Sequence, residues 1–128
     1  YGAMIEASKK VKPWRNDVEK AALECYDSGA INFPVKVEIE FMFPRPISHY
    51  RTGQFAHLLK DSAPRHCISR INGDIDKVAR STLDGLSVSA GGSVLEDDSL
   101  VVELNTKKRY VNKDELPGAY IAISSICD

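Results

Sequence analysis

The chain has 128 residues, of which 43% are hydrophobic and 27% charged, and its formal net charge is −1. This composition is typical of one folded globular domain, so it excludes a disordered or fibrous chain. The longest uncharged stretch has twelve residues, whereas a bilayer span needs about 20, so no membrane segment is expected. Three scattered cysteines without a Cys-x-x-Cys motif favour a reducing cytosol over a secreted, disulfide-bonded protein.

The first half of the chain predicts a helix and then a strand. Pro13 suits the first turn of a helix, and Gly29 provides a stop. Between them, apolar residues recur at helical spacing: Trp14, Val18, Ala21, Ala22 and Cys25. Residues 35–43 then alternate between apolar and polar side chains, which indicates a half-buried strand ended by two prolines.

Residues 44–73 show no hydrophobic period and contain three prolines and two glycines. A loop of this length in a compact domain is usually functional. We therefore expect a long basic loop that faces the substrate, with one short helical turn near residues 55–60.

The second half predicts another helix and two strands. An amphipathic helix is expected over residues 75–86, with Asp74 near its N-cap, followed by a Gly/Ser-rich turn over residues 87–93. Strand character returns from residue 94, with Leu100, Val102 and Leu104 on one side, and a last strand spans residues 119–126. No repeat or linker divides the chain, so we predict a single α+β domain, a small mixed β-sheet with two main helices packed on one face.

Charge is unevenly distributed along the chain. Residues 44–73 hold five Lys/Arg and one Asp, a net charge of +4, whereas residues 74–103 hold seven Asp/Glu and two Lys/Arg, a net charge of −5. Clustered carboxylates repel one another unless side chains or metal ions neutralise them. The plain interpretation is a solvated acidic surface beside a solvated basic one, and only the basic segment favours contact with nucleic acid.

Two acidic motifs are candidates for chemistry: Asp74 and Asp76 at the start of the second helix, and an acidic run that ends in Asp97 and Asp98. Carboxylate oxygens are ligands suited to Mg²⁺ or Mn²⁺. If Asp74 precedes the first turn, it and Asp76 can converge on one metal ion. A carboxylate from the second motif then completes the metal site. Such a metal activates water and stabilises charge on a phosphoryl group.

A structural explanation of the same residues stays open. Asp is the favoured residue at helix N-caps and in turns, so Asp74 alone can cap the helix while Asp97 and Asp98 shape a turn. Arg80 lies one helical turn from both Asp76 and Asp84, which ion pairing at i,i+4 explains.

The two acidic motifs, with the helix and strand between them, resemble the RusA family of Holliday-junction resolvases, above all its phage-encoded branch. The segments that carry the resemblance are Asp74-Ile-Asp-Lys-Val-Ala-Arg-Ser-Thr-Leu-Asp-Gly-Leu86 and Glu96-Asp-Asp-Ser-Leu-Val-Val-Glu-Leu-Asn-Thr-Lys-Lys-Arg-Tyr110. With shorter similar segments at residues 8–15 and 55–63, it covers roughly residues 8–111. It implies one RusA-like nuclease domain over residues 1–128 that acts as a homodimer in the host cytosol.

The resemblance implies an endonuclease, dependent on Mg²⁺ with Mn²⁺ as an alternative, that nicks branched DNA symmetrically: four-way junctions, and by extension flaps and forks. The family's metal ligands fall on Asp74, Asp76 and Asp98. A catalytic family lysine falls on Arg80, which keeps the charge but cannot serve as a general base, so Arg80 is expected to contact phosphate. Lys77 either takes over part of that lysine's electrostatic role or is a solvated lysine of the first turn.

Family members open with a strand and a basic loop ahead of the segment that matches residues 8–15. The sequence predicts that this element is absent here, which would weaken DNA affinity.

Basic residues of the long loop and of the following strand are the expected DNA contacts. Such residues bind phosphates and position the substrate without recognising sequence, although any single one is more often a solvated charge. The candidates are Arg45, Arg51, Lys60, Arg65 and Arg70 in the loop, and Lys107, Lys108 and Arg109 on the strand.

Two other classes of function stay open. A domain of the same fold that binds branched DNA but cuts it weakly would bind equally well with Mg²⁺ or with a chelator. A carboxylate-pair hydrolase acting on a small substrate would be active without metal and would not bind DNA.

Overall fold

The computed structural model describes residues 2–6, 11–26, 29–69, 73–92 and 94–126. Four strands form one sheet in the order β1-β4-β2-β3. Their bounds are β1 Gly2–Glu6, β2 Val35–Phe43, β3 Val101–Tyr110 and β4 Gly118–Ser125. β2 and β3 run parallel and the other neighbours antiparallel, so the sheet is mixed, as the sequence predicted.

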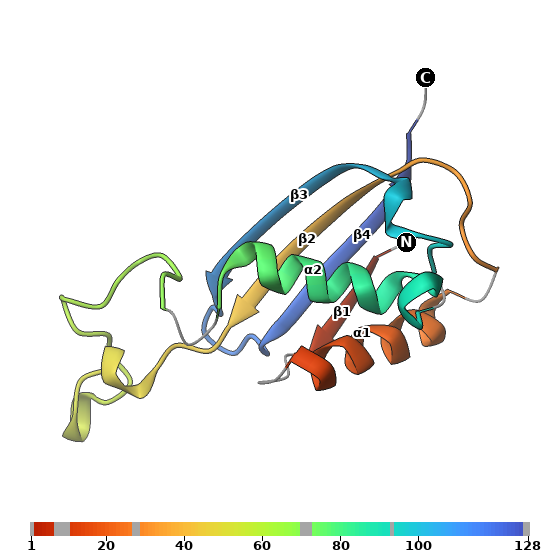
Figure 1. The fold of residues 1–128 in the computed structure, drawn as a ribbon. Helices are drawn as coiled ribbons and strands as arrows, with labels where there is room; N and C mark the ends of the chain where they lie inside the picture. Colours follow the sequence, from red (N-terminus) through yellow and green to blue (C-terminus); the bar gives the residue numbers. More distant parts are fainter. Residues whose placement is uncertain (1, 7–10, 27–28, 70–72, 93, 127–128) are drawn as a thin grey trace.

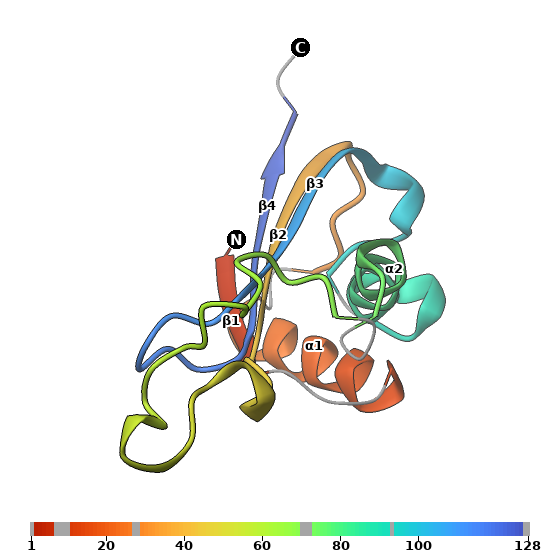
Figure 2. The same cartoon turned by 90° about the vertical axis from the view of Figure 1, so that its left-hand side faces the viewer.

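The helices α1 (Val11–Cys25) and α2 (Ile75–Leu86) both pack on one face of this sheet (Figures 1 and 2). Within the described residues, the opposite face carries no helix. This layered α+β arrangement confirms the predicted fold class. Among the described residues, no helix is long and apolar enough to cross a membrane.

The core lies between the sheet and the two helices. The central strand β2 supplies four buried apolar side chains, at positions 35, 37, 39 and 41, which pack against Trp14 and Val18 of α1 and Leu86 of α2. Burying an apolar side chain of this size stabilises the fold by about 1.5–3 kcal/mol. The indole N–H of Trp14 donates to Thr82 Oγ1 at 3.0 Å, which satisfies the polar atom that this ring carries into the core.

The N-terminal strand corrects one prediction. Gly2–Glu6 forms β1, which pairs antiparallel with β4, Ala3 opposite Ile121. A strand therefore precedes the segment at residues 8–15, contrary to the expected absence. Residues 3–5 are all apolar and do not alternate with polar residues, so the sequence gives no strand period here. The ladder with β4 is what makes the segment a strand.

The strand β3 is less buried than its alternating sequence suggested. It is the edge strand of the sheet, and Val102 and Leu104 are 62% and 42% exposed. The pairing with β2 shifts at this end, since Val101 lies opposite Val35 but Glu103 lies opposite Lys36. An edge strand with a bulge has a neighbour on one side only, so alternation alone does not bury it.

Candidate active site

The turn into α2 carries the first acidic motif. Gly73 has a φ of +82°, a conformation that glycine adopts readily, and Asp74 follows with extended backbone at the N-cap position. The Asp74 carboxylate makes no capping hydrogen bond and lies 3.8 Å from the ammonium of Lys77, with both side chains exposed. Asp74 therefore occupies the cap position while its carboxylate stays available to another ligand.

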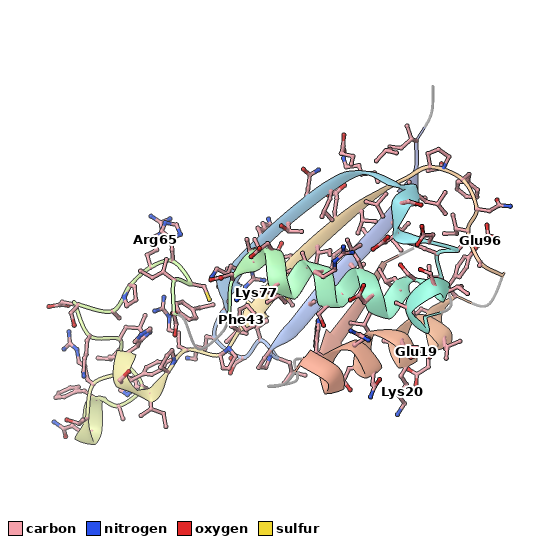
Figure 3. All side chains as sticks on the ribbon, viewed as in Figure 1. Glu19, Lys20, Phe43, Arg65, Lys77 and Glu96 are labelled. Atoms are coloured by element: carbon pink, nitrogen blue, oxygen red, sulfur yellow. The ribbon has the colours of Figure 1, made fainter. Side chains whose placement is uncertain are left out.

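Asp76 lies in the first turn of α2 and is exposed. Within the described residues, its side chain has no hydrogen-bond or ion-pair partner. Figure 3 shows Lys77 at the end of α2 nearest the long loop, and Glu96 at the other end of the molecule. The first residue of the second acidic run is thus remote from the start of α2.

The second acidic motif divides into two roles. The Asp97 carboxylate accepts hydrogen bonds from the hydroxyls of Ser99 at 2.7 Å and Ser89 at 2.8 Å, and these bonds lower the pKa of Asp97. Asp97 therefore shapes the turn, as the structural explanation proposed. Asp98 instead begins a short 3-10 helix, Asp98–Leu100, and reaches α2.

Arg80 connects α2 to the second acidic motif. Its guanidinium donates to Asp98 at 2.5 Å and lies 4.0 Å from Asp84. Asp84 in turn lies 3.5 Å from the guanidinium of Arg15 on α1. The closest partner of Arg80 is thus a residue 18 positions away. Of the two i,i+4 pairings predicted from the sequence, only the one with Asp84 is found among the described residues, and it is the longer contact.

Metal binding can be tested against these residues. Asp74 and Asp76 fit a hard divalent cation by their chemistry and their exposure. Among the described residues, however, no three His, Cys, Asp or Glu side chains are grouped as a ready metal site. The third expected ligand, Asp98, is paired with Arg80, so a cation shared by all three carboxylates would have to compete with this guanidinium.

The basic run of β3 is split between the two faces of the sheet. Lys107 lies opposite Glu40 of β2, and Arg109 opposite Met42, on the face without helices. Lys108 lies opposite the core residue Phe41, on the face that α2 covers. Its ammonium donates to the carbonyl oxygen of Gly73 at 3.2 Å.

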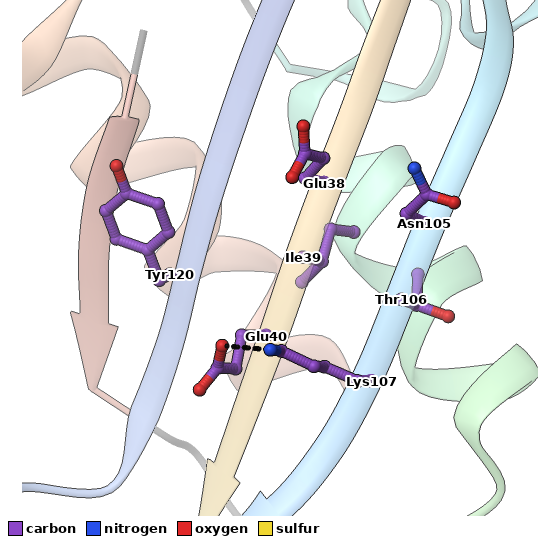
Figure 4. A pocket seen from close by; sticks show the side chains of 7 residues that line it. All are labelled: Glu38, Ile39, Glu40, Asn105, Thr106, Lys107 and Tyr120. Atoms are coloured by element: carbon purple, nitrogen blue, oxygen red, sulfur yellow. Dashed lines mark ion pairs between the residues drawn. The ribbon is translucent and has the colours of Figure 1, made fainter.

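The face without helices holds an ion-pair network. Figure 4 shows Lys107 and Glu40 paired on it, beside a pocket of about 330 Å³. Arg109 donates to Glu40 at 2.5 Å and to both oxygens of Glu115 at 2.6 and 2.7 Å. These bonds lower the pKa of Glu40, lower that of Glu115 to about 2 and raise that of Arg109. The positive charges of Lys107 and Arg109 are thus largely neutralised by Glu40 and Glu115.

The described part of the long loop, residues 44–69, projects beyond the ends of β2 and β3 as an arm (Figures 1 and 2). It contains two short 3-10 helices, Ile47–His49 and Gly53–Phe55; the second lies at the start of the predicted helical turn. The arm's exposed basic residues are Arg51, Lys60 and Arg65, whereas Arg70 lies outside the described residues. Arg51 pairs with Asp61 at 3.4 Å and donates to the Leu59 carbonyl at 3.3 Å.

Arg45 anchors the root of the arm. The sequence predicts it as a phosphate contact, whereas its guanidinium lies 4.4 Å from the centre of the Tyr110 ring and donates to the Pro64 carbonyl at 2.6 Å. His49 packs edge-on against the same ring at 5.5 Å. These contacts tie both ends of the arm to the end of β3. Spacing offered no signal for them, because they join residues up to 65 positions apart in the sequence.

The fold and the site define a small α+β domain with exposed carboxylates at a helix N-terminus beside a basic arm (Figure 1). The family model of endodeoxyribonuclease RusA matches residues 2–124. The chain therefore belongs to the RusA endodeoxyribonuclease family, as the resemblance of its acidic motifs implied. A comparison with curated proteins found no match.

Proposed function

We propose that this protein is a divalent-metal-dependent endonuclease that resolves Holliday junctions, and related flaps and forks, by paired phosphodiester hydrolysis in the cytosol. Membership of the RusA family supports the nuclease and its branched DNA substrate. The observation that carries the proposal is the contact between Arg80 and Asp98, since it brings the second acidic motif onto the helix that carries the first.

Asp74, Asp76 and Asp98 would hold Mg²⁺ or Mn²⁺. When bound, the ion would lower the pKa of a water nucleophile and neutralise charge on the phosphate. The protein's own part is to hold these carboxylates and the phosphate in place. Asp74 and Asp76 both lie at the N-terminal end of α2.

Arg80 and Lys77 would supply positive charge to the phosphate. With Asp98 engaged by a cation, the planar guanidinium of Arg80 would be free to pair with two phosphate oxygens. Lys77 is exposed and only loosely paired, 3.8 Å from Asp74. Its proposed role is electrostatic, because a positive charge beside the carboxylates attracts the phosphate.

The arm would hold the duplex arms of the junction through phosphate contacts of Arg51, Lys60, Arg65 and Arg70. Aromatic and aliphatic side chains are also exposed on it, Phe55 by 49% and Leu58 by 41%, which suits contact with unstacked bases at a branch point. A homodimer would present two sites about a two-fold axis, as paired nicks require. Lys107 and Arg109 lie on the other face of the sheet and would contact only DNA that wraps around the edge strand.

A second candidate is a branched-DNA-binding module that cuts weakly. One observation favours it: Asp98 is already neutralised by Arg80, so the third carboxylate is not free to receive a cation. This module and the nuclease differ in their response to metal.

A nicking assay separates the two candidates. A labelled four-way junction and a matched linear duplex are incubated with wild type, Asp76→Asn and the control Asp17→Asn, an exposed change on α1, each with Mg²⁺ or a chelator. The nuclease cuts the junction only with metal; Asp76→Asn abolishes cutting and Asp17→Asn does not. Tight junction binding by all three proteins without any cutting would establish the binding module instead.

A further inference from the structure

Alternation along β3 singles out one of three consecutive basic residues. Lys107 and Arg109 lie on the face without helices and are paired with Glu40. Lys108 lies between them in sequence but on the α2 side, where the strand ends beside the turn into that helix. Glu40, the acidic partner of Lys107 and Arg109, lies on the other face of the sheet from Lys108. The Lys108 ammonium instead donates a hydrogen bond to a backbone carbonyl.

The contact that Lys108 makes is specific to the acidic turn. Its ammonium donates to the carbonyl oxygen of Gly73, the residue directly before Asp74. Gly73 has a left-handed φ of +82° and Asp74 an extended backbone, with φ −78° and ψ 145°. The direction of the Asp74 carboxylate depends on the backbone conformation of these two residues. The backbone of Asp74 is also held by the first hydrogen bond of the helix, which Val78 N–H donates to the Asp74 carbonyl oxygen at 3.2 Å.

We propose that Lys108 is a positioning residue of the candidate active site, which holds the Gly73 carbonyl and so fixes the turn that presents Asp74. The inference deepens the proposed nuclease function and rests on it for its catalytic meaning. The side chain is partly buried on the rigid strand β3, so it ties the turn to the sheet. The strand β3 begins directly after the 3-10 helix Asp98–Leu100. One strand therefore adjoins the second acidic motif at its start and contacts the turn of the first motif near its end.

The structural test compares Lys108→Met with Lys107→Met, the adjacent lysine on the other face. Two-dimensional ¹H–¹⁵N spectra are recorded without metal or DNA. Lys108→Met shifts the amide signals of residues 73–75, because loss of a hydrogen bond to the Gly73 carbonyl changes the Asp74 peptide group. Lys107→Met leaves these three signals in place. Lys108→Arg, which keeps a donor, restores them at least in part.

The functional test uses Mn²⁺ titration of the protein alone and nicking kinetics on the junction. Residues that orient metal ligands typically contribute 10–100-fold, so Lys108→Met lowers Mn²⁺ affinity and kcat by about tenfold or more, with KM little changed and thermal unfolding near wild type. An exposed control on α1, Lys20→Met, changes neither quantity.

Two results would overturn the proposal. One is unshifted amide signals at residues 73–75 in Lys108→Met. The other is a raised KM with unchanged kcat and Mn²⁺ affinity, which would make Lys108 a phosphate contact. If the wild type neither binds Mn²⁺ nor cuts, the proposed function fails, while the spectra still decide whether Lys108 holds the turn.

Discussion

At the scale of single residues, Arg80 is the most consequential side chain of the candidate site. The resemblance of the acidic motifs implies a lysine at this position, whereas this chain has a guanidinium that pairs with the carboxylate proposed to bind metal. A forked, permanently charged donor holds a carboxylate more firmly than a single ammonium does. The metal-free state of the site is therefore partly neutralised by its own side chain.

Replacing Arg80 by Gln should separate metal binding from catalysis. Without the guanidinium, Asp98 is free and the local charge is more negative. Because the pair is exposed, it contributes at most ~1 kcal/mol, so Mn²⁺ affinity should rise by up to about fivefold. Cutting of the junction should nevertheless fall, since the phosphate loses its cation. Titration of Mn²⁺ into the protein and single-turnover nicking measure the two effects, and a fall in Mn²⁺ affinity would contradict the competition between metal and Arg80.

At the scale of elements, the close approach of α1 to α2 depends on a glycine. A Cβ on Gly85 would lie 2.9 Å from both the Arg15 carbonyl oxygen and Val18 Cβ. Neither atom is the end of a flexible side chain. The spacing of the two helices, and with it the location of α2 over β3, therefore requires a residue without a side chain at this position.

Gly85→Ala should destabilise the protein even though alanine is the better helix former. Overpacking a core contact costs about 1–3 kcal/mol, which outweighs the helix-propensity gain of about 1 kcal/mol. Urea unfolding measures the difference. As a control, Asn16→Ala at an exposed position of α1 should leave stability unchanged or slightly raised. An equally stable Gly85→Ala would show that the helices can separate without loss.

The sheet face without helices is held by the charge network around Arg109. The Arg109 guanidinium holds the pKa of Glu115 at about 2, against an ordinary value of 4.5. A lowered folded-state pKa means that the network stabilises the fold fully above pH 4.5, and that this contribution is lost as the pH falls toward 2.

Glu115→Gln should therefore lower the melting temperature at neutral pH, and this effect should shrink as the pH falls toward and below 2. Melting curves of both proteins across this range test the sign, with Glu24→Gln, an exposed change on α1, as the control. A Tm difference that is constant with pH would mean that Glu115 acts through packing rather than through charge.

At the scale of the whole molecule, the basic arm and the first acidic motif lie at the same end. The arm and the start of α2 both lie beside the ends of β2 and β3 (Figure 1). Arg45 and Tyr110 hold the root of the arm there. A substrate phosphate can therefore contact the arm's cations while another lies against the carboxylates.

Replacing Arg51, Lys60 and Arg65 together by Gln should weaken junction binding and reduce its salt dependence. Each phosphate contact contributes about 0.9 to the slope of log affinity against log salt, so the slope should fall by about 2–3. Fluorescence anisotropy at several salt concentrations measures this change, and Lys20→Gln on α1 should leave the slope unaltered. An unchanged slope in the triple variant would remove the arm from the DNA interface.

Much of this protein was determined by its sequence alone. Hydrophobic periods located α1, β2, α2 and β4, because burial against a common core imposes period 3.6 on helices and period 2 on strands. The strand expected from residue 94 begins only at Val101, after the short 3-10 helix Asp98–Leu100. The two acidic motifs and their separation pointed to the family that the match over residues 2–124 then showed. Hydrophobic periods and motifs are local properties, because they depend on residues that are close together in the chain.

Only the tertiary structure decided which charges meet. The pairing of β2 with β3 sends Lys107 and Arg109 to one face and Lys108 to the other. Folding brings Arg80 into contact with Asp98 and Arg45 into contact with Tyr110. Gly2–Glu6 becomes a strand because it pairs with β4. Such contacts depend on register and on the packing of distant segments, and sequence spacing carries no information about either until the sheet has formed.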